Sequence, residues 1–117
     1  MTELAVGIDL GGTYTKLALV DTSGRISRRA KLSTTAYKTR QELVAAIVSE
    51  VEVILEKAHL FPKALLGVGI GVPGLVDFDR GLVHTLTNVP GWKNTPLKKM
   101  LEAKLKVPVL VLSLIHI

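Results

Sequence analysis

Residues 9–16 combine the glycines and side chains that a phosphate-binding turn needs. They read Asp9-Leu10-Gly11-Gly12-Thr13-Tyr14-Thr15-Lys16. Consecutive glycines let the backbone approach an anion and turn with positive φ, and their N–H groups can form a nest for phosphate oxygens. Thr13 adds a hydroxyl donor, Lys16 can offer its charge to a phosphate, and Asp9 is suited to holding Mg²⁺ through water. The alternative is a plain Gly-Gly hairpin, but the aspartate before the glycines and the lysine after them favour phosphate.

A glycine-rich segment follows later in the chain, with glycines at positions 67, 69, 71 and 74. A glycine in a strand often marks the close approach of another backbone or of a ligand. For Gly67 and Gly69 we expect tight packing against the Asp9 turn, whereas for Gly74 packing and ligand contact are equally open. Asn88 lies in a later loop, where an asparagine is usually a turn residue.

The remaining polar residues do not form a recognisable catalytic or metal-binding pattern. Asp77 and Asp79 are expected in a hairpin turn, and Trp92 is expected to anchor the core. The three histidines do not have metal-ligand spacing. The absence of cysteine excludes a disulfide scaffold, a cysteine-ligated zinc site and a thiol nucleophile within these 117 residues.

Composition indicates one ordered domain. The chain has 117 residues, of which 48% are hydrophobic and 21% charged, as in ordinary globular proteins. The net charge of +5 comes from basic residues in two stretches, 25–40 and 93–106. Nucleic-acid binding would need these residues on one face with interleaved aromatic residues, but only Trp92 adjoins the second stretch. We therefore expect solvated faces and no nucleic-acid partner. The sequence shows no leader and no apolar run of the roughly 20 residues that span a bilayer, so a soluble, cytoplasmic protein is expected.

The pattern predicts an α/β fold with the order β-β-β-α-β-(hairpin)-α-β. Strands are expected at residues 4–8, 14–20, 25–33, 65–70 and 107–112, with hairpin strands at 75–76 and 82–83. A Thr39–Glu42 capping box starts a helix that ends near His59. A second helix, with Thr95 as N-cap and Pro96 at its first position, runs to about Lys106. The result is a mixed five-stranded sheet with an inserted hairpin.

Three ordered motifs resemble the ROK family of sugar kinases and repressors, within the actin and hexokinase superfamily. They are Gly7-Ile8-Asp9-Leu10-Gly11-Gly12-Thr13, Gly67-Val68-Gly69-Ile70-Gly71-Val72-Pro73-Gly74-Leu75-Val76-Asp77 and Leu86-Thr87-Asn88-Val89-Pro90-Gly91-Trp92. The resemblance covers residues 4–111 and implies the ribonuclease H-like N-terminal domain of an actin-type ATPase.

The resemblance also implies an activity and a set of site residues. The complete protein would phosphorylate a hexose with ATP and Mg²⁺, with glucose favoured by Leu75, and it is expected to be a homodimer. Asp9 would position Mg²⁺, and the phosphates would be surrounded by Gly11, Gly12, Thr13 and Lys16. The sugar would be contacted by Gly74, Thr87 and Asn88. N-acetylmannosamine or fructose kinases and sugar-responsive repressors of the family are the alternatives.

Residues 112–117 depart from the family pattern, which calls for Asp/Glu-Asn-Asp after Val111, where this chain reads Leu112-Ser113-Leu114. The aspartate of that pattern would be the general base. We therefore interpret residues 1–111 as an incomplete N-terminal domain and residues 112–117 as a foreign or misread tail. No catalytic base is expected in the chain, and zinc is expected only in a missing C-terminal part. Repressors of the family resemble a kinase domain preceded by a helix-turn-helix, and a first strand that begins by Leu4 favours the kinase.

Overall fold

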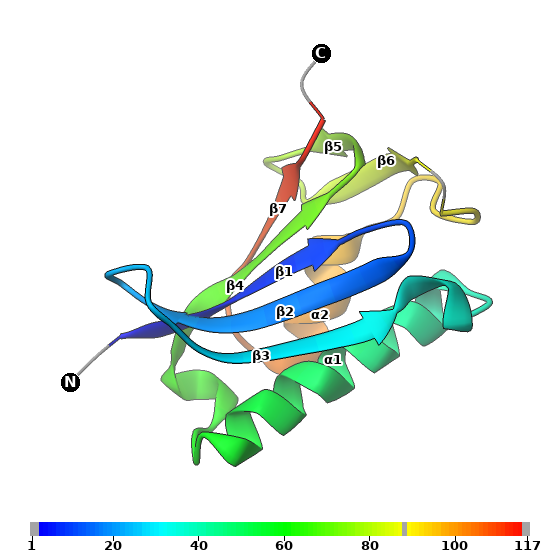
Figure 1. Ribbon diagram of the computed structural model, residues 1–117. Coiled ribbons are helices and arrows are strands. Elements are labelled where there is room, and N and C mark those ends of the chain that lie inside the picture. Colours follow the sequence, from blue (N-terminus) through cyan, green and yellow to red (C-terminus); the bar gives the residue numbers. More distant parts are fainter. Residues whose placement is uncertain (1–2, 88, 116–117) are drawn as a thin grey trace.

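The computed structural model describes residues 3–87 and 89–115. Its main sheet has five strands in the order β3-β2-β1-β4-β7 (Figure 1). The strands are β1 (Leu4–Leu10), β2 (Tyr14–Asp21), β3 (Ile26–Ser33), β4 (Leu65–Val72) and β7 (Val109–Ser113). β1, β2 and β3 form an antiparallel meander, while β4 pairs parallel to β1 and β7 pairs parallel to β4. The predicted mixed five-stranded sheet is therefore confirmed.

The inserted hairpin is also present, as a separate two-stranded sheet of β5 (Gly74–Asp77) and β6 (Leu82–Leu86). Its turn uses a carboxylate as expected, because Asp77 Oδ1 accepts a hydrogen bond from the Arg80 N–H at 3.2 Å. The hairpin begins two residues after β4 ends and extends beyond the edge of the main sheet (Figure 1).

Helix α1 (Arg40–Lys57) begins at the predicted capping box. Thr39 Oγ1 accepts from the Glu42 N–H at 3.1 Å, and Glu42 Oε2 accepts from the Lys38 N–H at 2.9 Å. Two backbone N–H groups at the helix start thus gain partners. The helix ends two residues earlier than expected, and His59 adopts a left-handed φ of 58°.

The predicted start of the second helix is wrong. Helix α2 (Leu97–Leu105) begins after Pro96, and no side chain caps it. Thr95 instead forms an isolated antiparallel bridge with Val83, through backbone N–O distances of 2.7 and 2.8 Å. The first helical bond runs from the Met100 N–H to the Pro96 carbonyl, and the Thr95 hydroxyl accepts from Arg40 instead of from a helix N–H, so Pro96 and not Thr95 is the N-cap.

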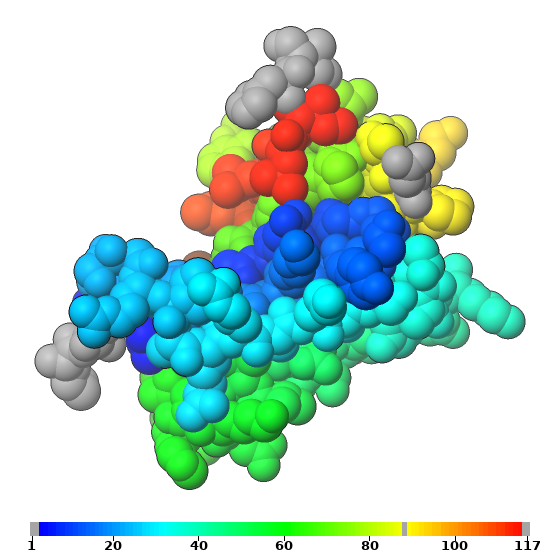
Figure 2. All heavy atoms as spheres, in the orientation of Figure 1, coloured from blue at the N-terminus to red at the C-terminus, as the bar shows by residue number. Residues whose placement is uncertain are grey.

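Both helices pack on one face of the main sheet. A single core joins buried residues of α1 and α2 to alternate residues of the strands, among them Val6, Ile8, Ile70 and Val111. Trp92 belongs to this core at 3% exposure, as predicted. The opposite face, called the open face below, is turned to the viewer in Figure 2, where strand residues form the surface and α1 (green) shows along one rim.

Candidate functional site

Three parallel strands end at the same edge of the sheet and bring distant motifs together. In register, Asp9 of β1 lies beside Gly71 of β4, and Gly71 lies beside Leu112 of β7. The predicted phosphate-binding turn, residues 11–13 and called the phosphate turn below, follows β1 directly, and Gly74 comes three residues after Gly71. In open α/β sheets, ligands bind outside the carboxyl ends of parallel strands. The first two sequence motifs therefore meet where a ligand is expected.

The turn between β1 and β2 is tighter than a flexible glycine loop. The Gly11 N–H donates to the Tyr14 carbonyl at 3.0 Å, and a Cβ on Gly11 would lie 2.6 Å from that oxygen. Glycine is required at position 11 for this close approach. The expected positive φ is wrong, because the described glycines with positive φ are Gly24, Gly81 and Gly91.

Thr13 and Gly12 lie at the outer end of this turn. The Thr13 side chain is exposed, and the Thr13 backbone carbonyl accepts a hydrogen bond from the Thr34 N–H at 2.9 Å. Behind it, the Thr15 and Thr34 hydroxyls form a buried hydrogen bond at 2.8 Å. These contacts fix the turn against the segment after β3 and leave the Thr13 hydroxyl available to solvent.

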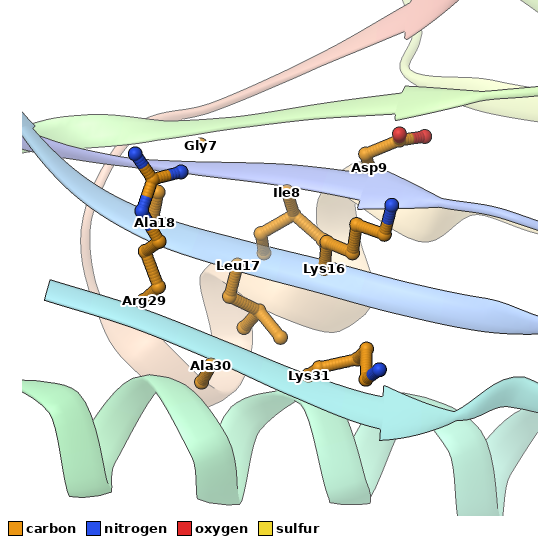
Figure 3. A pocket seen from close by; sticks show the side chains of 9 residues that line it. All are labelled: Gly7, Ile8, Asp9, Lys16, Leu17, Ala18, Arg29, Ala30 and Lys31. Carbon is orange, nitrogen blue, oxygen red and sulfur yellow. The ribbon is translucent and has the colours of Figure 1, made fainter. Parts of the chain in front are cut away.

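Asp9 and Lys16 point to the same side of the sheet, on the open face (Figure 3). They are direct neighbours across the β1–β2 pair, and both are exposed. With Arg29 and Lys31 of β3 they border a groove of about 720 Å³ whose lining includes Gly7 and Ala18. The groove thus carries one carboxylate and three cationic side chains, which suits an anionic ligand that brings a divalent cation.

Arg29 and Lys31 were not predicted as site residues. The sequence predicted only that they belong to a strand over residues 25–33. Register places Lys31 beside Lys16, and Arg29 beside Ala18. The signal was the alternation of β3, in which Leu32 is buried while Arg29 and Lys31 share the other face. Using that signal requires knowing which β3 residue pairs with which β2 residue.

Asp9 is suited to a Mg²⁺ ion that is held mainly by the phosphates of a bound substrate. In residues 3–87 and 89–115 there is no group of three or more histidine, cysteine, aspartate or glutamate side chains that could hold a metal. Mg²⁺ commonly keeps several waters and binds through one or two carboxylates together with substrate phosphates. A single exposed carboxylate at the carboxyl end of β1 is compatible with that mode and with water-mediated contact.

At the centre of the open face, glycines leave the backbone of β1 and β4 uncovered by side chains. One row across the sheet consists of Arg29, Ala18, Gly7, Gly69 and Leu110. A Cβ on Gly69 would meet nothing within 4 Å, so the expected packing of Gly69 against the Asp9 turn is wrong. Gly67 is tightly packed, but against the Pro108 carbonyl, 2.8 Å from its Cβ position, and not against the turn. The reason is the parallel β4–β7 pairing, which brings Pro108 alongside Gly67.

Gly74 and Thr87, two of the predicted sugar residues, are brought together by the β5–β6 hairpin. The Thr87 N–H donates to the Pro73 carbonyl at 2.8 Å, and the Thr87 side chain is exposed. Gly74 is buried, and a Cβ there would overlap the Thr85 carbonyl. Hairpin packing is thus sufficient reason for glycine at position 74. Asn88, the third predicted sugar residue, lies outside the described residues.

The residues after Val111 occupy the same edge. Ser113 Oγ donates to the Gly74 carbonyl at 2.6 Å, and the Leu114 N–H donates to the Val72 carbonyl at 2.8 Å. The Leu114 side chain covers Gly71, lying 2.7 Å from the Cβ position of that glycine. Position 114 is therefore adjacent to Asp9 across β4, and here it carries a hydrocarbon side chain that is half exposed.

None of the helices in the described part of the chain is long and apolar enough to cross a membrane.

Comparisons with known proteins agree with this architecture. The glucokinase of Halalkalibacterium halodurans is 33% identical over 106 residues, which are 91% of this chain and 32% of that protein. The xylose repressor of Caldicellulosiruptor bescii is 30% identical over 106 residues, 91% of this chain and 26% of the repressor. The chain thus spans a third or less of the length of these relatives.

Among solved structures, a ROK family glucokinase from Streptomyces griseus in complex with glucose and AMPPNP superposes with a TM-score of 0.78 and 34% identity. The match covers 92% of this chain and 32% of the glucokinase. The sequence model of the ROK family matches residues 5–115. The fold, the ordered motifs and this match over nearly the whole chain show that it belongs to the ROK family.

Proposed function

We propose that the complete protein containing this chain is an ATP-dependent hexose kinase that converts glucose to glucose 6-phosphate. The observation that carries the proposal is the convergence of two candidate subsites on one edge. Asp9 lies beside Gly71, and Gly71 leads within three residues to Gly74 and its neighbour Thr87. The glucokinase relatives support a sugar kinase of this family.

On the nucleotide side, Asp9 would hold Mg²⁺ through water, and Gly11, Gly12, Thr13 and Lys16 would surround the phosphates. Mg²⁺, when bound with ATP, neutralises charge on the transferring phosphoryl group. Lys16 is exposed beside Asp9, so its ammonium group can reach an anion on the open face. The exposed Thr13 hydroxyl offers a further donor at the turn.

On the sugar side, Thr87 and Asn88 would contact hydroxyl groups, and Gly74 would shape the backbone beside them. A general base within reach of the 6-hydroxyl is also required. We place that base at position 114, next to Asp9, where Leu114 cannot accept a proton. The 117-residue chain by itself is therefore expected to be inactive. The exposed Leu110, Leu112 and Leu114 are also expected to make it poorly soluble.

A sugar-responsive regulator is the second candidate, because a xylose repressor is 30% identical over the same region. The two candidates differ in turnover. A kinase needs Asp9 for phosphoryl transfer, whereas a regulator needs only sugar binding. A cytoplasmic location and a homodimeric assembly belong to the same proposal.

The test uses residues 1–111 continued by the sequence that follows them in the genome. ADP release from ATP is measured with glucose and, separately, with N-acetylmannosamine, fructose and xylose. Turnover with glucose as the preferred sugar supports the proposal. Preference for N-acetylmannosamine or fructose overturns the choice of substrate. Sugar binding without ADP release in the presence of any of the sugars supports the regulator. ADP release by the 117-residue chain at a comparable rate would contradict the placement of the base.

A further inference from the structure

Arg40, the first residue of α1, reaches a segment more than fifty positions away in the sequence. Its Nη1 donates to the Lys93 carbonyl at 3.0 Å and to Thr95 Oγ1 at 2.9 Å. Thr95 is fully buried, and Arg40 is half-buried. Hydrogen bonds from a charged donor to partly buried acceptors are stronger than neutral ones. Arg40 therefore attaches the start of α1 to the segment that precedes α2.

That segment, residues 87 and 89–94, connects β6 to the Thr95 bridge and follows directly from the candidate sugar residue Thr87. Its beginning is tied down by the bond from the Thr87 N–H to the Pro73 carbonyl. Its end is held by the bond from the Asn94 N–H to the His84 carbonyl at 3.1 Å, by the Thr95 bridge and by Arg40. Between these ends, Trp92 is the buried anchor.

Among the described residues, a cavity separates part of the segment from the phosphate turn. This cavity of about 180 Å³ is lined by Gly12 of the turn and by Val89, Pro90 and Trp92 of the segment. Val89 and Trp92 hold the middle of the segment to the core, and hydrogen bonds hold its two ends. Among the hydrogen bonds named here, those of Arg40 are the ones that tie the segment to α1.

We propose that Arg40 is a positioning residue for the sugar side of the site. By holding Lys93 and Thr95 against the start of α1, it keeps the far end of the segment that follows Thr87 in place beside the phosphate turn. This rests on the proposed kinase function. Its consequence is specific: loss of Arg40 loosens sugar binding and leaves the nucleotide residues on β1 and β2 in place.

The experiment compares Arg40→Ala, Arg40→Lys and Arg28→Ala in the complete protein. Arg28 is an exposed arginine of the edge strand β3 and is the matched control. For Arg40→Ala we expect the KM for glucose to rise about tenfold, as loss of charge-assisted hydrogen bonds implies, with the KM for ATP and kcat little changed. Arg40→Lys should recover part of the loss, and Arg28→Ala should behave as wild type.

A second measurement does not depend on catalysis. Hydrogen exchange of the hydrogen-bonded Asn94 and Thr95 amides should accelerate in Arg40→Ala and not in Arg28→Ala. Thr95→Val, which removes the hydroxyl acceptor and keeps the shape, should add little to Arg40→Ala in a double-mutant cycle. It also serves as the test variant if Arg40→Ala does not fold.

The outcomes separate the two proposals. An unchanged glucose KM in Arg40→Ala, or equal rises in both KM values, overturns the positioning role. Unchanged exchange at Asn94 and Thr95 shows that Arg40 does not hold the segment. If wild type phosphorylates no sugar while exchange responds to Arg40, the kinase proposal fails and the structural attachment stands.

Discussion

The two faces of the main sheet use the same strands for different purposes. On the covered face, alternate residues such as Ile8 and Ile70 are aliphatic and buried by the two helices. On the open face, the central residues of β1, β2 and β4 are small or charged: a Cβ on Gly69 would meet open space, and Asp9 and Lys16 are exposed side by side, while β7 exposes Leu110 and Leu112. One face carries the packing that stabilises the domain, and the other carries the side chains that can meet a ligand.

This difference teaches that function and stability are divided here by strand alternation and not by region of the sequence. Neighbouring residues on one strand point to opposite faces. Asp9, the candidate metal residue, lies between two buried core residues, Ile8 and Leu10. A substitution at Asp9 and one at Ile8 should therefore affect different properties of the protein, although the two positions are adjacent.

The largest effect is expected on the covered face. Ile70→Ala removes a fully buried side chain, and it should lower the free energy of unfolding by about 2–5 kcal/mol through lost burial and a new cavity. Gly69→Ala, one residue earlier, meets open space and should change it by less than about 1 kcal/mol. Urea unfolding of otherwise identical chains measures both. Similar losses at the two positions would show that the open face is packed as tightly as the covered one.

The second effect concerns the open face alone. Asp9→Ala in the complete protein should reduce kcat at least about a hundredfold, because the metal and the transferring phosphoryl group lose their anchor. Its melting temperature should stay close to that of wild type, because the Asp9 side chain is exposed. Asp79→Ala, an exposed carboxylate in the hairpin turn, is the matched control. Turnover unchanged by Asp9→Ala would remove the phosphate-site assignment.

The smallest effect lies at the opposite end of β2 from the phosphate turn, in the β2–β3 connection. Asp21 Oδ1 accepts hydrogen bonds from the Ser23 hydroxyl at 2.6 Å and from the Ser23 and Arg25 N–H groups at 2.9 Å. The Ser23 hydroxyl, and then the Arg25 N–H, lower the pKa of this exposed carboxyl below its ordinary value.

A lowered pKa stabilises the fold above the ordinary pKa, and that contribution is lost as pH falls through the folded-state value. Asp21→Asn should therefore be slightly less stable than wild type near neutral pH. The difference between the two should shrink below about pH 4, the ordinary pKa of aspartate. Urea midpoints measured from pH 7 down to pH 3 test this, and a difference that grows in acid would contradict the assigned hydrogen bonds.

Local patterns predicted most of the elements. The Thr39–Glu42 capping box marked the start of α1 because both of its hydrogen bonds form within one helical turn. The meander, the hairpin and the order of the elements along the chain also followed from the sequence, which placed Asp9 at the end of β1. The start of α2 was missed because the partner that holds Thr95, Val83 of β6, lies twelve residues earlier in the chain.

The sequence by itself determined the order of the elements and the chemistry of Asp9, the glycine turn and Lys16, because these depend on neighbours within a few residues. Only the tertiary structure decided that Arg29 and Lys31 join Asp9 and Lys16 on one face, since strand register sets which side chains meet across a sheet. It likewise decided the attachment of Arg40 to Thr95, which pairs residues 55 positions apart. Contacts between residues far apart in the sequence form only when the core has brought their elements together, and no local sequence pattern encodes which elements meet.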